Sequence, residues 1–143
     1  MAGTRQFSVN LGLVNFRHSK MNVFTYLFVI YCSLSMVAAV YQVANQDDFD
    51  YQLKNAGEKL VVVNFFATWS GPSKMIAPRF EAMSKEYTDV VFLKVDVDES
   101  ETIASSYNIE VLPTFVYLKN GVKVAQLSGA NENQIRTLIE RFK

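Results

Sequence analysis

Two serine side chains three positions apart, Ser70 and Ser73, have the spacing in this chain that most directly suggests chemistry. They belong to residues 69–74, Trp-Ser-Gly-Pro-Ser-Lys, in which Gly71 and Pro72 predict a tight turn from a strand into a helix. The first turn of a helix has unpaired N–H groups and the positive end of the helix dipole, so it can stabilise an anionic nucleophile. The sequence therefore predicts a nucleophile position at a helix start, and serine stands there.

A serine hydroxyl becomes nucleophilic when an adjacent base takes its proton, and a third group generally orients that base. The only histidine, His18, precedes the predicted domain, and no spacing favours Lys74 or Lys94 as the base. We therefore expect no serine catalysis. The simpler interpretation is that Ser70 caps a helix beginning near Ser73 and that both hydroxyls bond to nearby backbone groups.

The segments on either side of the turn predict the elements that hold the two serines. Residues 60–67, Leu-Val-Val-Val-Asn-Phe-Phe-Ala, are apolar on both faces, as in a buried strand with layers packed on each side. The apolar residues after Ser73 follow helical spacing, and Pro78 within that helix predicts a kink. A central strand thus leads through the turn into a helix.

The rest of residues 40–143 alternates strand and helix patterns. Further strands are expected at residues 40–43, 90–97, 114–119 and 122–127, the last two joined by a hairpin turn at Asn120-Gly121. Further helices are expected at residues 47–54 between an Asn45 cap and Gly57, at residues 99–107 after Asp98 or Ser100, and after an Asn131 cap. The order is βαβαβαββα, an α/β domain whose mixed central sheet is covered by helices on both faces.

This domain resembles the thioredoxin family, whose active site reads Trp-Cys-Gly-Pro-Cys-Lys at the same strand–turn–helix junction. The resemblance covers residues 40–143 and implies the thioredoxin fold, with a cis peptide bond before Pro113. Several separate motifs support it: residues 69–74, Pro78, Lys94 with Asp96 and Asp98, Tyr107-Asn108-Ile109, Leu112-Pro113-Thr114, Lys119-Asn120-Gly121 and Gly129-Ala130.

Both cysteines of the family motif are serines in this chain. In the family the first cysteine attacks a target disulfide as a thiolate and the second resolves the mixed disulfide, so the exchange needs sulfur twice. Ser70 and Ser73 stand at these two positions. Asn64 stands where thioredoxins usually carry a buried aspartate that relays protons to the resolving cysteine, and an amide does not titrate. We therefore expect no active catalytic residue.

The resemblance also implies a shallow apolar groove in which an extended peptide segment pairs as an added strand. The matching positions are Trp69, Gly71, Pro72, Val111, Leu112, Pro113, Thr114, Gly129 and Ala130. We expect a redox-inactive module that binds a protein or peptide segment and uses no cofactor. One alternative is a thiol–disulfide oxidoreductase, a protein-disulfide reductase of cell redox homeostasis, seen here as a Cys-to-Ser form. Another is a divergent copy under little functional constraint.

Residues 1–39 predict a leader. The apolar stretch at residues 21–40 follows Arg17, His18 and Lys20, and residues 37–39, Val-Ala-Ala, permit signal-peptide cleavage after Ala39. The same stretch approaches the length of a membrane-spanning helix. Either a signal peptide or a membrane anchor would place residues 40–143 in the lumen or outside the cell. The alternatives are a mitochondrial transit peptide and a cytoplasmic protein that starts at Met36.

Charge and cysteine content exclude several kinds of site. Residues 1–46 carry three basic side chains and no acidic one, whereas residues 47–143 carry eleven basic and fourteen acidic side chains. No basic patch suggests nucleic acid, and only residues 21–40 suggest contact with a membrane. The single cysteine, Cys32, and single histidine both lie in the predicted leader. Neither a disulfide framework nor a metal site is therefore expected.

Overall fold

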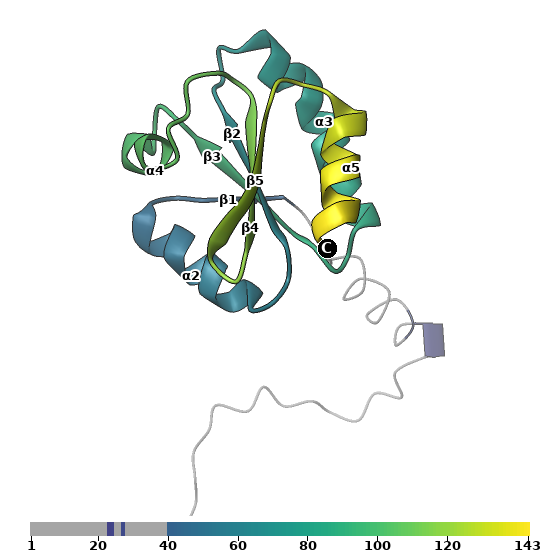
Figure 1. Cartoon of the computed structure of the whole chain (residues 1–143). Coiled ribbons are helices and arrows are strands. Elements are labelled where there is room, and N and C mark those ends of the chain that lie inside the picture. The colour runs from purple at the N-terminus through teal and green to yellow at the C-terminus, as the bar shows by residue number, and fades with distance from the viewer. Residues whose placement is uncertain (1–22, 25–26, 28–39) are drawn as a thin grey trace, which may run out of the picture. The chain divides into compact units, whose positions relative to one another are not determined.

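The structure is a computed structural model that describes residues 40–143, together with Val23, Phe24 and Leu27, which are helical (Figure 1). The predicted leader, apart from these three residues, lies outside the described residues, as does the predicted cleavage point after Ala39. No helix in the described part of the chain has both the length and the apolar character needed to cross a membrane.

Residues 40–143 form strands and helices in the predicted order (Figure 1). The strands are β1 (Tyr41–Gln42), β2 (Val61–Phe66), β3 (Val91–Asp96), β4 (Thr114–Lys119) and β5 (Val122–Ser128). The helices are α2 (Gln46–Ala56), α3 (Gly71–Glu86), α4 (Glu101–Ser106) and α5 (Glu132–Phe142). The α/β class and the βαβαβαββα order are thus confirmed.

The strands form one mixed sheet in the order β1-β3-β2-β4-β5. The strands β1, β3 and β2 are parallel, whereas β4 is antiparallel to β2 and to β5. Because β2 lies between β3 and β4 and is covered on both faces, its side chains are almost all buried. The continuous apolar run at residues 60–67 therefore identified a central strand correctly.

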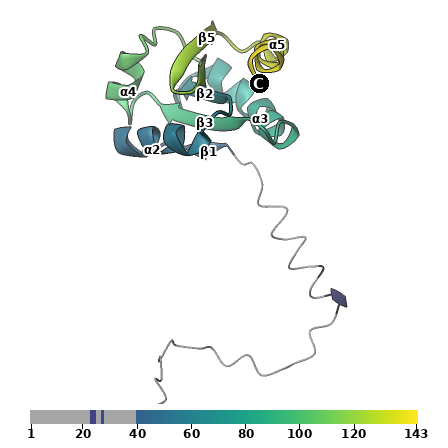
Figure 2. The same ribbon diagram turned by 60° about the horizontal axis from the view of Figure 1, so that its bottom comes forward.

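Helices cover both faces of the sheet, with α3 and α5 on one face and α2 and α4 on the other (Figures 1 and 2). Alternate residues of β2 point to opposite faces, so Val62 joins the core under α3 and α5 while Val63 joins the core under α2 and α4. In the first core Phe80 of α3 packs against Phe92 and Phe115 of the sheet. Two apolar cores therefore hold the sheet from both sides.

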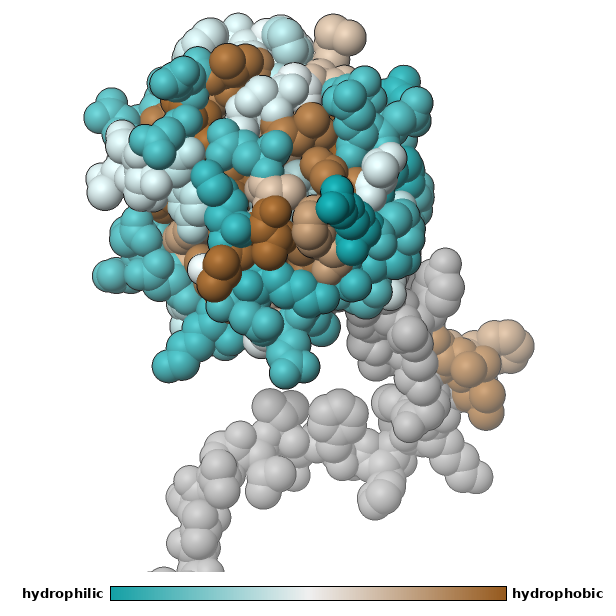
Figure 3. All heavy atoms as spheres, in the orientation of Figure 1, coloured by the Kyte–Doolittle hydropathy of each residue, from teal (hydrophilic) through white to brown (hydrophobic). Residues whose placement is uncertain are grey.

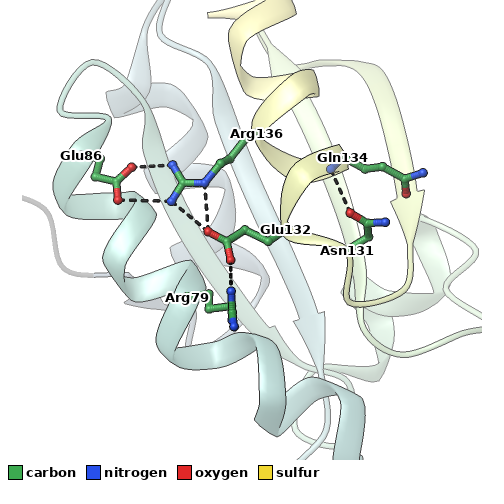
Figure 4. Close-up of polar contacts among 6 residues, drawn as sticks. All are labelled: Arg79, Glu86, Asn131, Glu132, Gln134 and Arg136. Atoms are coloured by element: carbon green, nitrogen blue, oxygen red, sulfur yellow. Dashed lines mark hydrogen bonds and ion pairs between the residues drawn. The ribbon is translucent and has the colours of Figure 1, made fainter.

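Ion pairs join α3 to α5 at the surface (Figure 4). Arg79 of α3 pairs with Glu132 of α5, and Arg136 of α5 reaches both Glu132, at 3.0 Å, and Glu86. The hydrogen bonds from Arg79 and Arg136 hold the pKa of the Glu132 carboxyl below its usual range, and the bond from Arg136 does the same for Glu86. These four charges are matched by opposite charges from the same chain.

Asparagine side chains cap α2 and α5 at the positions that the sequence predicted. Asn45 caps α2 by accepting a hydrogen bond from the Asp48 N–H at 3.0 Å, and Asn131 caps α5 through the Gln134 N–H at 3.1 Å. The hairpin turn between β4 and β5 has φ of 52° at Asn120 and 74° at Gly121. Asparagine and glycine tolerate these positive values, which match the twist of the two strands.

Candidate functional site

Ser70 is the N-cap of α3, the helix that follows β2. Its hydroxyl Oγ accepts a hydrogen bond from the Ser73 N–H at 3.3 Å, and its side chain is buried. The cap is as predicted, but the helix begins at Gly71, two residues before the predicted start near Ser73. The reason is Pro72, because a proline in the first turn of a helix has its φ preset and lacks an N–H that would be unpaired anyway.

Ser73 therefore lies within the first turn of α3, where its surroundings differ from those of Ser70. Its side chain is 2% exposed, and its Oγ has no hydrogen-bond partner among the described residues. The prediction that both hydroxyls bond to backbone groups is confirmed for Ser70 and wrong for Ser73. A serine inside a helix usually donates to a carbonyl three or four residues earlier. For Ser73 these residues are Ser70 and Trp69, which precede α3, and the Ser70 carbonyl already accepts the Lys74 N–H at 3.1 Å.

A cavity of about 70 Å³ lies beside Ser73. Its polar lining comes from Asn64 of β2, Ser73, Glu81 of α3 and Lys94 of β3, the last directly opposite Asn64 in the sheet. The Asn64 side chain is 3% exposed, and its Oδ1 has no partner among the described residues. Two positions that the sequence singled out separately thus line one cavity, which has the size and polarity to hold a water molecule.

No base is hydrogen-bonded to either serine in the described part of the chain. Among residues 40–143, Ser70 Oγ has one hydrogen bond, which it accepts from the Ser73 N–H. Lys94 lines the cavity, but no hydrogen bond joins it to Ser73, and Lys74 is an exposed residue of α3. The geometry therefore provides a helix cap and a polar cavity, and it lacks the nucleophile–base pair that serine catalysis requires.

Trp69 is an exposed aromatic residue directly before the Ser70 cap. The indole is 69% exposed, and its Nε1–H donates to Asp98 Oδ2 at 2.8 Å. Asp98 is itself held after β3, because its N–H donates to Asp96 Oδ1 at 3.0 Å. The sequence identified Asp98 only as part of a motif and as a possible cap. Its hydrogen bond to Trp69 was missed because 29 positions separate the two residues.

The loop before β4 lies at the same edge of the sheet as the end of β2, because Phe65 and Thr114 are opposite each other in the antiparallel pair. The Leu112-Pro113 peptide bond is cis. The Pro113 carbonyl accepts a hydrogen bond from the Gly129 N–H at 2.8 Å, and Thr114 Oγ1 donates to the Val111 carbonyl at 2.7 Å. These bonds fix the loop, whereas the N–H and C=O of Leu112 form no hydrogen bond within the described residues.

The predicted groove residues therefore belong to three segments at this edge of the sheet: residues 69–72 after β2, residues 111–114 before β4, and Gly129-Ala130 after β5 (Figure 1). Trp69, Gly71, Pro72, Val111 and Ala130 are exposed, Leu112 and Gly129 are half-buried, and Pro113 and Thr114 are buried. Met75 of α3, which the sequence analysis did not include, is 75% exposed and adds apolar surface.

Exposed apolar side chains are not confined to these segments. Figure 3 shows apolar patches between hydrophilic side chains on the side of the molecule drawn in Figure 1. On β5, both Val122 and Val124 are exposed. The three segments are therefore distinguished from the rest of the surface by the unpaired backbone of Leu112 and the fixed indole of Trp69, more than by apolar exposure alone.

Comparisons with known proteins agree with this geometry. The family model described as Thioredoxin matches residues 40–141. Thioredoxin from Callithrix jacchus is 47% identical over 103 residues, 72% of this chain and 98% of that protein. Thioredoxin from Gallus gallus is 46% identical over 101 residues, 71% of this chain and 96% of that protein.

Solved structures of thioredoxins also match this fold. The X-ray structure of Fasciola hepatica thioredoxin superposes with a TM-score of 0.72 at 42% identity, and covers 73% of this chain and 100% of that one. The crystal structure of Schistosoma mansoni thioredoxin superposes with a TM-score of 0.70 at 43% identity, and covers 73% of this chain and 96% of that one.

Proposed function

The chain belongs to the thioredoxin family, and on that premise we propose that its domain is a non-catalytic member that binds an extended segment of a partner protein. The proposed binding surface consists of the three segments around Trp69, Pro113 and Gly129. The homologues are thioredoxins, so the domain inherits a scaffold built for disulfide exchange. This chain carries serine at both dithiol positions of that scaffold.

The observation that carries the non-catalytic part is the pair of hydroxyls at the start of α3. Thiol–disulfide exchange needs a thiolate that attacks sulfur and a second thiol that releases the product. At these positions Ser70 Oγ serves as a helix cap, and Ser73 Oγ is buried. Asn64, at the position of the proton-relay aspartate, has an amide that neither gains nor loses a proton at ordinary pH.

The binding part is supported by the groups that remain available at this edge of the sheet. An extended segment pairs with a sheet or loop through backbone hydrogen bonds, so it needs an unpaired N–H and C=O. Leu112 offers both, beside a buried Pro113 whose own carbonyl is already bonded to Gly129. Trp69 offers a large apolar surface whose orientation is fixed by Asp98. Neither feature depends on sulfur.

Two assays test the proposal. Insulin reduction by the chain as it stands should equal background, and clear turnover would contradict the non-catalytic part. Binding to an array of synthetic peptides of random sequence should be lost in Trp69→Ala. It should persist in Tyr51→Ala, a matched variant that removes an exposed aromatic side chain from α2. Equal binding by both variants would contradict the proposed surface.

The second candidate is a thiol–disulfide oxidoreductase represented here by a Cys-to-Ser form. The retained Trp69, Gly71 and Pro72 favour it, because they belong to the family's active-site motif. Asn64 and the long leader argue against it. An engineered change that removes the dithiol would leave the buried aspartate in place and would seldom keep a long apolar leader. The coding sequence decides: cysteine codons at positions 70 and 73 of the native gene would favour the oxidoreductase.

We also propose that residues 40–143 lie in the secretory pathway, either secreted or anchored with the domain in the lumen or outside the cell. The support is the sequence of residues 1–39, with its positive start, apolar stretch and small residues before Val40. N-terminal sequencing of the protein from its own cells tests this proposal. A first residue at Val40 supports cleavage, and a start at Met36 would instead favour the cytoplasmic alternative.

A further inference from the structure

A second cavity, of about 330 Å³, lies between the starts of α2 and α4. Residues 44–46 line it from one side and residues 98–103 from the other. The topology creates it, because β1 and β3 are parallel neighbours and the segments that follow them leave the sheet at the same edge. This is also the edge at which α3 begins after β2, so the cavity adjoins the proposed binding surface.

The cavity is strongly acidic. Asp98, Glu99 and Glu101 line it, and none of them forms an ion pair within the described part of the chain. Two further acidic residues, Asp47 and Asp48, lie in the first turn of α2 next to the lining residue Gln46. No group of three metal-binding side chains with suitable geometry occurs among the described residues. The lining therefore suits an organic cation better than a metal ion.

One wall of the cavity carries a buried hydroxyl without a partner. Ser100 is the residue before α4 and is 7% exposed, but its side chain makes no cap bond. Its Oγ has no hydrogen-bond partner among the described residues. A buried polar group without a partner is destabilising, by about 1–3 kcal/mol, and native proteins usually explain it by a water, an ion or a ligand. This hydroxyl is the second sign, independent of charge, that the cavity receives a hydrogen-bonding group.

We propose that the cavity receives an arginine side chain of the partner segment whose binding is proposed above. Arginine carries five N–H donors in a planar fork, and its pairing with carboxylates is geometrically specific. The carboxylates of Asp98, Glu99 and Glu101 and the Ser100 hydroxyl supply acceptors of the matching kind. The inference rests on the proposed function, because it identifies one side chain of the segment bound there.

Asp98 connects the cavity to the binding surface. One of its carboxylate oxygens accepts the Trp69 indole N–H, while the residue also lines the cavity. A segment that crosses Trp69 thus has a negatively charged cavity directly beside it. The proposed partner segment is therefore extended, with an apolar residue that packs on Trp69 and an arginine that enters the cavity.

The test compares peptide pairs that differ only in charge. Peptides that bind on the array are synthesised with arginine or with citrulline, its neutral isostere, and the full-length chain is titrated by fluorescence anisotropy. The arginine form should bind about tenfold more tightly at low salt, and the preference should shrink as added salt screens the charges. In Glu99→Gln/Glu101→Gln the preference should disappear, while the citrulline form should bind as before.

A matched control removes the same charge from the opposite edge of the sheet. Glu58 and Asp89 precede β2 and β3, whereas the cavity follows β1 and β3, so Glu58→Gln/Asp89→Asn should keep the preference. A preference that survives Glu99→Gln/Glu101→Gln, or that falls equally in the control, would overturn the assignment to this cavity. Equal binding of both peptides by the unmodified chain would overturn the inference and leave the proposed binding surface intact.

A second measurement does not depend on the binding surface. Titration of the chain with N-acetyl-arginine amide, followed by NMR, should shift the Ser100 and Glu101 amide signals. If those signals move while no peptide binds, the cavity assignment stands and the proposed function fails. If calcium chloride moves them and the arginine compound does not, the cavity is a metal site and the inference is wrong.

Discussion

On the face where α3 packs against α5, every charged side chain in the cluster of Figure 4 has a partner of opposite sign from the same chain. At the edge of the sheet where α3 and α4 begin, several polar groups instead lack a hydrogen-bond or ion-pair partner among the described residues. Asn64 Oδ1, Ser73 Oγ and Ser100 Oγ are buried without hydrogen-bond partners among the described residues. Nearby, Asp98, Glu99 and Glu101 form no ion pair there.

The difference distinguishes the α3–α5 face, whose polar contacts stabilise the fold, from the edge of the sheet, whose unpaired polar groups are available to a ligand. A folded chain pairs nearly all of its buried polar groups, so those left over are concentrated where the fold has a reason other than stability to keep them. In this molecule they lie at the carboxyl ends of parallel strands, the position at which α/β sheets generally bind ligands. The following predictions test that separation, starting with the largest expected effect.

Restoring sulfur should restore exchange chemistry. Ser70→Cys/Ser73→Cys places two thiols at the start of α3, where the helix dipole favours the thiolate. We expect insulin reduction with dithiothreitol to rise about tenfold or more above the unmodified chain. The single variant Ser70→Cys is the control, because it can attack a disulfide but has no second thiol to release the product. If the double variant does not reduce insulin, residues other than Ser70 and Ser73 must also prevent the exchange.

The two serines should differ when each is truncated. Ser70→Ala removes the α3 cap and should lower the free energy of unfolding by about 1 kcal/mol. Ser73→Ala removes a buried hydroxyl without a protein partner, so the free energy of unfolding should stay within about 0.5 kcal/mol or rise. Urea denaturation of both variants measures the difference. An equal loss in both would show that the Ser73 hydroxyl is well bonded, through water in the cavity.

Neutralising acidic side chains should have opposite small effects at the two regions. Bonds from Arg79 and Arg136 lower the pKa of Glu132, so its ionised form stabilises the fold above the unfolded-state pKa. That contribution is lost as pH falls through the lowered folded-state pKa. Glu132→Gln should therefore reduce the melting temperature slightly at pH 7 and flatten its decline in acid.

The matched change at the cavity is Glu99→Gln/Glu101→Gln. These carboxylates have no cationic partner among the described residues, and they lie beside the like charge of Asp98. Relief of this repulsion offsets the lost interaction of Glu101 with the helix dipole of α4, so the melting temperature at pH 7 should stay unchanged or rise. Thermal melts of this variant and of Glu132→Gln, at pH 7 and at an acidic pH, complete the comparison. A fall as large as that of Glu132→Gln would remove the distinction between the two regions.

Much of the fold could be predicted from local signals. The apolar run at residues 60–67, the caps at Asn45 and Asn131 and the turn at Asn120-Gly121 each depend on neighbours a few residues away. The bounds at the start of α3 were less accurate, because Pro72 and Ser73 each suit more than one position near a helix start. Dipeptide preferences do not decide between such neighbouring starts.

The candidate site was only partly predictable. Motif positions identified Asn64, Ser70 and Ser73, and the family's proton relay implied that Asn64 lies near Ser73. They did not identify Lys94, from another strand, as a third polar side chain at the same cavity. The contact of Trp69 with Asp98 and the acidic cavity depend on the order of strands in the sheet. Residues 44–46 and 98–103 meet only because β1 lies beside β3, and nothing within either segment encodes that neighbour.

The cap formed by Ser70 has a consequence for how long a complex lasts. A thiol at this position would join its target covalently for part of each cycle, and reductant would then release the target. The Ser70 hydroxyl instead stays bonded to its own helix, so the residence time of the proposed partner segment would be set by its dissociation rate alone. Such a complex would be released by dilution and by ionic strength, and its lifetime would be independent of the redox potential around it.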